Sequence, residues 1–403
     1  MLVLKLAWRS IWRNRTRTLI TTLGIMIGVM MVIFASGFAV GFSEKMVRTS
    51  TQSRSGEAQL TAVGWAKTLE ETNVMSGLDE RLALLDASPK VQAAAPRIVG
   101  FGLLSIGSRS RGVQLLGVYP ARESKVTNWD SRLVAGEYLA EPGDMLIGAK
   151  LAEELEVEVG AKLILTGADV NTGEAATELV YVRGLLSTGD NGLDEGAAIV
   201  HIAQAQRVVG LPDAAHVIAL DVTANTLEPD VIEADIAAFA SDTVEARSWR
   251  QTNAMIAEVH QMMGAYMDMI LFMIFLIISF GIVNTISMSL LERMHEFGVM
   301  RAIGTSPWQL AGQIVTEAGF LGLVGAIPGL LAGLGLNAYY ASVGLNFSEM
   351  NAYGMTFVDP IYPLVNVPEA LRVAAIFTLL TALAATVSAI RVALVKPVDA
   401  MRS

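Results

Sequence analysis

The 403-residue sequence contains no cysteine and only four histidines, and both scarcities limit the chemistry it can perform. Without cysteine, disulfides, zinc–thiolate sites and thiol nucleophiles are excluded. His201, His216 and His260 have no second ligand at metal-binding spacing, and neither G-x-S-x-G nor H-E-x-x-H occurs. We therefore expect no catalytic residue, no metal site and no cofactor bound by this chain.

Charge is also missing from four long stretches of a chain whose mean hydropathy is +0.48. Leu19–Phe42, Met269–Leu291, Ala318–Ser348 and Val373–Ile390 have 24, 23, 31 and 18 uncharged residues. At about 1.5 Å per residue, a helix of each is long enough, or nearly so, to cross about 30 Å of hydrocarbon. The first stretch is too long for the apolar core of a usual cleaved signal peptide, so we expect it to be retained.

These stretches predict an α-helical membrane protein with four transmembrane helices and a mixed α/β extracytoplasmic domain inserted between helices 1 and 2. The expected segments are a cytoplasmic amphipathic entry helix at 1–18, transmembrane helix 1 at 19–42, the outer domain with helical stalk ends at 43–258, transmembrane helix 2 at 259–290, a short cytoplasmic helix at 291–306, transmembrane helix 3 at 307–341, an outer loop at 342–369, transmembrane helix 4 at 370–394 and a cytoplasmic tail at 395–403.

Basic residues set the expected orientation, because Lys and Arg next to membrane helices concentrate on the cytoplasmic side. Eleven of the 29 lie outside 43–258, and ten of these fall on one side of the four-helix arrangement. Both termini are therefore predicted to be cytoplasmic, and the outer domain periplasmic in a cell with two membranes. That domain holds 18 basic and 31 acidic residues, and its acidic surface argues against nucleic-acid binding.

Periodicity in the outer domain predicts helices and strands in alternation. The predicted helices lie around Leu82–Leu85, at Ala149–Leu155 and at Leu227–Phe239. The predicted strands are Val91–Leu104, Gly112–Val118, Lys162–Thr166, Glu178–Leu185 and Ala197–Ile202. The acidic cluster at 153–158 is interpreted as a solvated helix face rather than as a catalytic pair.

A methionine-rich seam of period 3.5 runs from the end of the outer domain into helix 2, and helix 1 carries phenylalanine at steps of four. The residues of the seam recur at steps of four, three, four, three and four: Met255, Val259, Met262, Tyr266, Met269 and Met273. These side chains could line a flexible cavity near the outer leaflet for an acyl chain or another bulky amphiphile. The candidate cavity residues are Phe34, Phe38, Phe42, Met262, Tyr266, Met269 and Met273. The plainer alternative, which the pattern favours, is helix–helix packing or contact with lipid.

Helix 3 carries Gly325, Gly329 and Gly333 at steps of four, which predict a face that another helix can approach closely. The sequence leaves the partner open between helix 4, helix 2 and a second subunit. Pro328 should kink this helix, and Glu317, if it lies at membrane depth, needs a partner or must face the interface.

The segment between helices 2 and 3 is the most heavily charged part of the apolar region. Its composition predicts a helix over Leu291–Ile303, with Arg293, Phe297 and Arg301 on one face. An ordinary tight connection would explain the arginines but not an aromatic side chain that projects toward the cytoplasm. We therefore interpret Phe297 as a contact for a partner protein.

The same segment carries strong helix boundary signals. Gly304 is expected to end the first helix, and Ser306 to cap the next one, with Pro307 at its first position and Gln309 completing a capping box. The connection is thus predicted to be stiff, so that a push on the short helix moves both neighbouring membrane helices.

Residues 290–310, LLERMHEFGVMRAIGTSPWQL, resemble the signature of the FtsX-like permease family of ABC transporters, E-R-x-x-E-x-G-x-x-x-A-x-G. The opening LAWRSIWRNRTRTLITTLGIMIGV and the closing VKPVDAMR resemble the same proteins, with Asp399, Met401 and His295 as departures. The stretch 130–167 is similar to the core domain of the lipoprotein-releasing permeases and of the macrolide exporter MacB. The signature residues are Glu292, Arg293, Glu296, Gly298, Ala302 and Gly304.

The resemblance implies a permease of the mechanotransmission kind, in which the helix at 291–306 is a coupling helix seated on a cytoplasmic ATPase. The coupling residues would be Glu292, Arg293, Glu296, Phe297, Gly298, Arg301, Ala302 and Gly304. The sequence lacks G-x-x-x-x-G-K-[ST], so ATP and Mg²⁺ are expected on a separate ABC ATPase dimer. A second permease subunit, identical or paralogous, would complete the transporter.

The expected function is extraction of lipoproteins from the outer leaflet of the bacterial inner membrane for delivery to a periplasmic carrier. This type is favoured over MacB because only four residues precede Lys5, whereas MacB has a nucleotide domain fused in front. Two alternatives stay open: export of peptides, antibiotics or other amphiphiles from the periplasm, and ATP-driven signalling that controls a cell-wall hydrolase. A membrane-anchored enzyme ranks last, because no catalytic constellation occurs.

Overall fold

The computed structural model describes residues 15–223, 227–347 and 351–394, and its contacts divide the chain into two compact units. The helical unit comprises the described parts of 1–42, 261–345 and 361–403, and the outer unit comprises Ser43–His260 and Asn346–Pro360. The segment expected as one loop, 342–369, is thus divided between the units. The expected entry helix at 1–18 and tail at 395–403 lie almost entirely outside the described residues.

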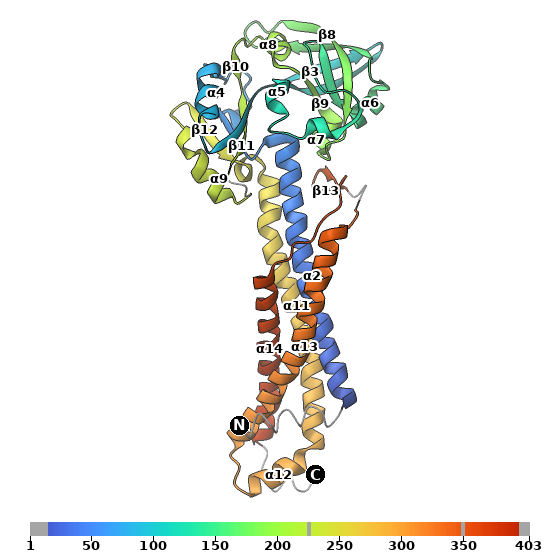
Figure 1. Ribbon diagram of the computed structural model, residues 1–403, viewed down its shortest axis with the longest axis vertical. Coiled ribbons are helices and arrows are strands. Elements are labelled where there is room, and N and C mark those ends of the chain that lie inside the picture. Colours follow the sequence, from blue (N-terminus) through green and yellow to red (C-terminus); the bar gives the residue numbers. More distant parts are fainter. Residues whose placement is uncertain (1–14, 224–226, 348–350, 395–403) are drawn as a thin grey trace. The chain divides into compact units, whose positions relative to one another are not determined.

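The helical unit is built from parts of four long helices and one short helix (Figure 1). They are α2 (Arg15–Ser50), α11 (Ala254–Glu292), α12 (Met294–Ala302), α13 (Pro307–Val343) and α14 (Val367–Leu394). Within the described residues, four helices are long and apolar enough to cross a membrane. All four run past an end of the uncharged stretch; α2 continues to Ser50 and α11 already begins at Ala254, because no proline intervenes.

Glycines let α13 pack closely against α2, the first membrane helix. This partner was not among the three that the sequence left open, which were helix 4, helix 2 and a second subunit. A Cβ on Gly325 would lie 2.7 Å from Cβ of Ile25, and one on Gly329 would lie 2.6 Å from the carbonyl oxygen of Met26. Gly333 meets Ile33 in the same way. Only a residue without a side chain lets the two backbones approach this closely.

The outer unit is organised around a ten-stranded sheet in the order β12-β1-β11-β3-β4-β9-β6-β8-β5, with β7 paired to both β3 and β8. The pairing β3-β4-β9-β6-β8-β7 returns to β3 and so closes six strands into a barrel. The barrel strands are β3 (Val91–Ile106), β4 (Arg109–Val118), β6 (Asp144–Gly148), β7 (Lys162–Ala168), β8 (Ala175–Leu186) and β9 (Ala197–His201). Closure pairs the edges that an open sheet would expose.

The long strand β3 takes part both in the barrel and in the remainder of the sheet on its other side, the side sheet formed with β11, β1 and β12. Its first half pairs with β11 (Val217–Val222), which continues to β1 (Ala58–Ala62) and β12 (Val244–Ser248), whereas its second half pairs with β7. β5 (Leu133–Gly136) extends β8. Two short hairpin strands, β13 (Asn351–Ala352) and β14 (Met355–Thr356), come from the divided loop.

Helices cover the barrel and the side sheet (Figure 1). They are α3 (Trp65–Thr68), α4 (Leu78–Asp86), α5 (Pro120–Glu123), α6 (Ala149–Leu155), α7 (Asn191–Gly196), α8 (Ile202–Val209), α9 (Pro229–Ile236) and α10 (Trp249–Thr252). The barrel interior and the inner faces of α6 and α8 form the main core, which includes Leu104, Leu115, Ile147, Leu165 and Val180.

Most predicted elements of the outer unit are confirmed. The helix at Ala149–Leu155 has the predicted bounds, and all five predicted strands are present, with ends that differ by a few residues. The predicted helix Leu227–Phe239 is shorter: α9 starts at Pro229, whose fixed φ suits a first helical position, and ends in a 3₁₀ turn at Ala237–Phe239.

Candidate functional site

The short helix α12 lies between α11 and α13, at one end of the helical unit (Figure 1). The predicted signals after this helix are confirmed, but its predicted start at Leu291 is not, since α11 continues to Glu292 and α12 begins at Met294. Gly304 has φ +103°, a conformation that glycine adopts without strain, and Ser306 accepts a hydrogen bond from the Gln309 amide in a complete capping box. The connection into α13 is therefore ordered by its own hydrogen bonds.

Arg293 ties α12 to α13. Its guanidinium lies 3.1 Å from the Glu317 carboxylate and 3.4 Å from that of Glu296, and it sits over the Phe297 ring at 5.1 Å from the centroid. The side chain of Arg293 is almost fully buried and that of Glu317 mostly so. Burial raises the cost of separating the two charges, so this pair resists displacement of α12 from α13.

The interpretation of Phe297 as an exposed contact for a partner is wrong. Its side chain is 3% exposed and belongs to the same buried cluster as Leu310 and Ile314 of α13. Arg293 and Phe297 are four residues apart and therefore lie on the same face of the helix. This face packs against α13, because the chain reverses its direction at Gly304. Gly298 is buried beside it, and both residues therefore act through packing.

Other residues form the exposed surface of this segment. Ile303 is 78% and Trp308 75% exposed, and Glu292, Glu296, Val299 and Ala302 are exposed as well, whereas Arg301 is half-buried. Sequence reasoning missed Val299, Ile303 and Trp308. Their signal was an apolar step of four followed by a tryptophan within a charged segment, which a soluble connection has no reason to display.

The candidate cavity residues fall into two sets. Met262, Tyr266, Met269 and Met273 of α11 are each about half exposed. On α2, Phe34 packs against Tyr340 of α13 with ring centroids 5.6 Å apart, and Phe38 lies 6.1 Å from Phe42. Phe34 is thus engaged in helix packing within the chain, and the amphiphile cavity stays a prediction.

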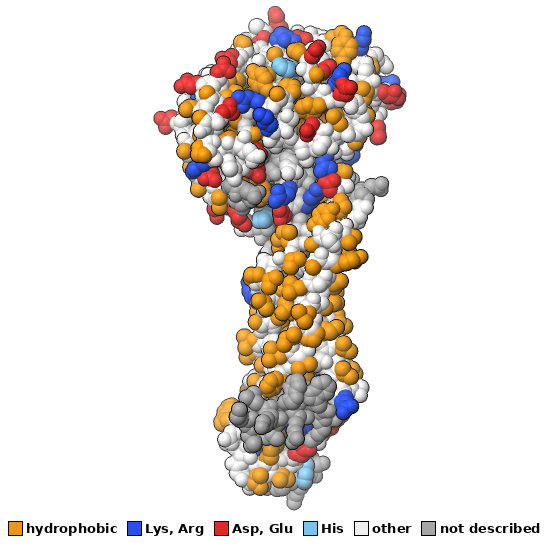
Figure 2. All heavy atoms as spheres, in the orientation of Figure 1, with side chains coloured by type: hydrophobic (Ala, Val, Ile, Leu, Met, Phe, Trp, Pro, Cys, Tyr) orange, Lys and Arg blue, Asp and Glu red, His pale blue; other side chains and the backbone are white. Residues whose placement is uncertain are grey.

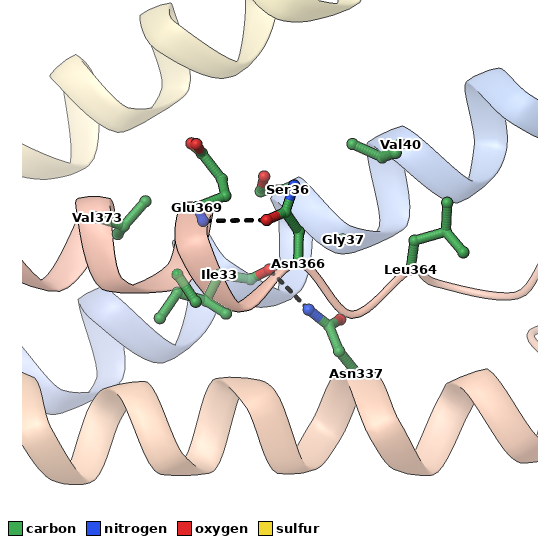
Figure 3. Close-up of a pocket in the computed structure, with 10 residues that line it drawn as sticks. Ile33, Ser36, Gly37, Val40, Asn337, Leu364, Asn366, Glu369 and Val373 are labelled. Carbon is green, nitrogen blue, oxygen red and sulfur yellow. Dashed lines mark hydrogen bonds between the residues drawn. The ribbon is translucent and has the colours of Figure 1, made fainter.

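A small pocket with a few polar groups in a mostly apolar wall lies within the helical unit, between α2, Asn337 of α13 and the start of α14 (Figure 3). Asn337 is buried, and its Nδ2 donates a 2.9 Å hydrogen bond to the carbonyl oxygen of Ile33. Gly37 makes room for this contact, because a Cβ there would lie 2.3 Å from Nδ2. The extended chain before α14 is fixed to the same turn, where Leu364 N donates to Gly37 O at 3.0 Å.

Within the outer unit, α2 ends in a π-helical turn, Thr51–Ser55, whose carbonyl groups accept hydrogen bonds from the segment at 128–129 and from Arg97 of β3. Asn128 N donates to Gln52 O, and the Trp129 indole donates to Ser53 O at 2.7 Å. Arg97 donates to Arg54 O and forms a buried, bidentate ion pair with Glu123. These bonds satisfy carbonyls that a helix end leaves open, and they fix the end of α2 to β3 and to the 3₁₀ turn that begins at Trp129.

Next to this turn, Glu57 and Asp221 hydrogen-bond to each other in a pocket that Arg48 and Lys125 also line. Burial, and next the charge of Asp221, raises the pKa of Glu57 to about 7, and burial also raises the pKa of Asp221. The pair thus binds a proton in a range where ordinary carboxylates are ionised. In the described residues, no group of three or more His, Cys, Asp or Glu side chains could hold a metal ion.

Comparison with known protein families covers both units. The MacB-like periplasmic core domain family matches residues 18–239, more than half of the chain, and the FtsX-like permease C-terminal family matches residues 269–397. The chain belongs to the FtsX/MacB family of ABC transporter permeases. The resemblance seen in the signature segment is confirmed, and this permease is a membrane protein with a periplasmic domain.

Individual relatives are distant. The lipoprotein-releasing system transmembrane protein LolC of Neisseria meningitidis serogroup B is 26% identical over 327 residues, covering 77% of this chain and 78% of that protein. LolC of Xylella fastidiosa (strain Temecula1) is 25% identical, covering 63% of this chain and 62% of that protein. An uncharacterized ABC transporter permease of Mycobacterium tuberculosis is 24% identical and is matched over 33% of its length. Family membership implies partnership with an ABC ATPase in general.

Proposed function

We propose that this permease works with a separate ABC ATPase dimer and a second permease subunit to extract lipoproteins from the outer leaflet of the inner membrane for a periplasmic carrier. The support is similarity to proteins named as parts of the lipoprotein-releasing system, which extends over most of the chain in one case. ATP and Mg²⁺ would be bound by the ATPase.

The proposed membrane arrangement has four spans formed by α2, α11, α13 and α14. The distribution of the basic residues supports an orientation with both termini and α12 in the cytoplasm and the outer unit in the periplasm. In this arrangement α12 is the only described helix between α11 and α13, so a cytoplasmic partner can reach it.

One observation supports coupling most directly: α12 is joined to α13 by the Arg293–Glu317 pair and by the burial of Phe297, while Val299, Ile303 and Trp308 stay exposed. The buried side holds α12 to the membrane helices, and the exposed apolar side offers a contact for the ATPase. ATP-driven movement of that contact would displace α13, and α2 with it, because glycines pack these two helices backbone to backbone.

Replacing one exposed apolar residue tests this division of labour. Ile303→Asp should lower co-purification with the ATPase and stimulated ATP hydrolysis at least about tenfold, since a charge there opposes an apolar contact. The matched control, Ile303→Val, should behave as wild type. Normal co-purification and stimulation by a folded, membrane-inserted Ile303→Asp protein would contradict the coupling role of this surface.

The MacB-like core domain supports a second candidate, export of peptides, antibiotics or other amphiphiles from the periplasm. Reconstituted transporter separates the two: the lipoprotein hypothesis predicts ATP-dependent release of a triacylated protein to a soluble carrier. Stimulation of ATP hydrolysis by a soluble amphiphile, without any lipoprotein release, would instead favour export.

A further inference from the structure

The small pocket of the helical unit has a buried hydrogen-bond acceptor in its wall (Figure 3). Asn337 is 2% exposed, and its Oδ1 has no hydrogen-bond partner among the described residues. The orientation of the amide is fixed, because turning it would sacrifice the bond from Nδ2 to Ile33 O. An acceptor buried without a donor costs about 1–3 kcal/mol, so this site calls for a donor.

Among the other polar side chains around the pocket, Ser36 and Asn366 carry both donors and acceptors, and Glu369 carries acceptors alone. Ser36 contributes a hydroxyl, and Glu369 a carboxylate of which one oxygen accepts from Arg372 at 2.6 Å. Arg372 itself points to solvent and also interacts with Asp268. Asn366 Oδ1 caps α14 by accepting from Glu369 N at 3.1 Å. A donor that carries positive charge is therefore the complementary ligand.

An anion is a poor match for the same place. The pocket lies at the N-terminus of α14, where free amide groups often bind anions. Here Pro368 has no amide hydrogen, the Glu369 amide is already bonded to Asn366, and the Glu369 carboxylate repels negative charge. Pro368, Asn366 and Glu369 thus remove the preference for anions that a helix N-terminus ordinarily has.

The size of the pocket further restricts which cation can bind there. The pocket has room for about one water-sized group and is flanked by Ile33, Val40, Leu364 and Val373. A primary ammonium group, with three donors on one small nitrogen, fits this space, whereas a trimethylammonium group is too large and has no donor. The apolar flank suits the methylene next to the nitrogen.

We propose that this pocket binds the primary ammonium of a membrane lipid head group, such as that of phosphatidylethanolamine. The proposal rests on the membrane arrangement of the proposed function. Asn337 precedes the end of α13 at Val343 by six residues, about 9 Å, which puts the pocket near the outer head-group region. Tyr339, Tyr340 and Tyr362 lie close to it in the sequence, as expected at a membrane interface.

Lipid exchange tests the proposal with the full-length transporter. In nanodiscs of phosphatidylcholine, a trace of ethanolamine lipid should be retained by the protein about tenfold over choline lipid when measured by native mass spectrometry, the discrimination expected of one charged hydrogen-bonded contact. Stepwise N-methylation of the ethanolamine should lower retention at each step. Glu369→Gln should remove most of the preference, whereas Ser342→Ala, at an exposed position of α13, should keep it.

Two outcomes separate this proposal from the membrane arrangement. Because the chain has no cysteine, the exposed Val365→Cys gives a single label site, which should react with a membrane-impermeant maleimide from the periplasmic side. Labelling from that side without any preference for ethanolamine lipid would overturn the ammonium site alone, leaving water as its occupant. Labelling only from the cytoplasmic side would overturn the arrangement and the proposal with it.

Discussion

The two units of this permease achieve close packing by opposite means. In the outer unit, branched aliphatic side chains fill a closed barrel, and the charged pair Arg97–Glu123 is buried beside it. In the helical unit, Gly325 and Gly329 remove side chains so that backbones touch. Apolar burial does not drive helices together in lipid, whereas it does in water. Each unit therefore uses the kind of packing that stabilises a fold in its own solvent, water for the outer unit and lipid for the helical unit.

The largest expected effect tests the glycine contact. Gly329→Leu should prevent α13 from packing on α2, because its Cβ alone would lie 2.6 Å from the Met26 carbonyl oxygen. The yield of monodisperse protein in detergent should fall to near zero. Gly335→Leu, on the same helix, is the matched control, since nothing lies within 4 Å of its Cβ position. Equal yields would show that the contact is dispensable.

The next effect tests the charged core of the outer unit. Glu123→Gln leaves the Arg97 guanidinium buried without a counter-charge, which costs about 3–5 kcal/mol. Hydrogen exchange of β3 and of the π-helical turn should accelerate accordingly. For comparison, Glu156→Gln removes the exposed pair with Arg109 and should change stability by less than about 1 kcal/mol. Similar effects of both variants would argue against the buried pair as a structural element.

A third variant sharpens the distinction between packing and contact residues in α12. Phe297→Ala should destabilise the helical unit by about 3 kcal/mol, because it leaves a cavity between α12 and α13. Trp308→Ala, at a largely exposed position, should leave the thermal midpoint unchanged but weaken ATPase binding. Both the thermal midpoint in detergent and the ATPase affinity are measured on both variants. A lower midpoint for Trp308→Ala together with weaker ATPase binding alone for Phe297→Ala would contradict the assignment of packing and contact residues.

The smallest effect concerns pH. The pKa of Glu57 is raised to about 7 in the folded protein, so the folded state binds more protons than the unfolded one between about pH 4.5 and 7. Stability from this group is therefore fully present below that range and is lost as pH rises through about 7. Hydrogen exchange of β1 and β11 in wild type should quicken over this range beyond the intrinsic rate increase. Glu57→Gln should remove the excess, and an unaltered profile would exclude Glu57 as its source.

Sequence reasoning worked where one local pattern suffices. The capping box at Ser306 and the helix Ala149–Leu155 were predicted at their observed positions, because caps and short amphipathic helices are specified by adjacent residues. The prediction that Phe297 is exposed was wrong for the opposite reason. Its neighbours along the chain are charged, and the apolar residues that bury it lie on α13, which follows the turn at Gly304.

The candidate site could be predicted only in part. The segment from Glu292 to Gly304 was found from its signature, but its partner-facing residues, Val299, Ile303 and Trp308, depend on which face α13 covers. Sequence reasoning could not find the Asn337 acceptor or the Glu57–Asp221 pair. In each case the interacting residues, Asn337 with Ile33 and Glu57 with Asp221, lie more than 150 positions apart, and no spacing rule connects them.

The sequence by itself determined the family, the apolar helices and the alternation of elements in the outer unit, since composition and short-range periodicity encode each of them. Only the tertiary structure decided that β3 closes a barrel, that the glycines of α13 face α2, and which side of α12 stays exposed. These features depend on contacts between distant segments, and a one-dimensional pattern records that a residue is apolar or small without recording what will lie against it.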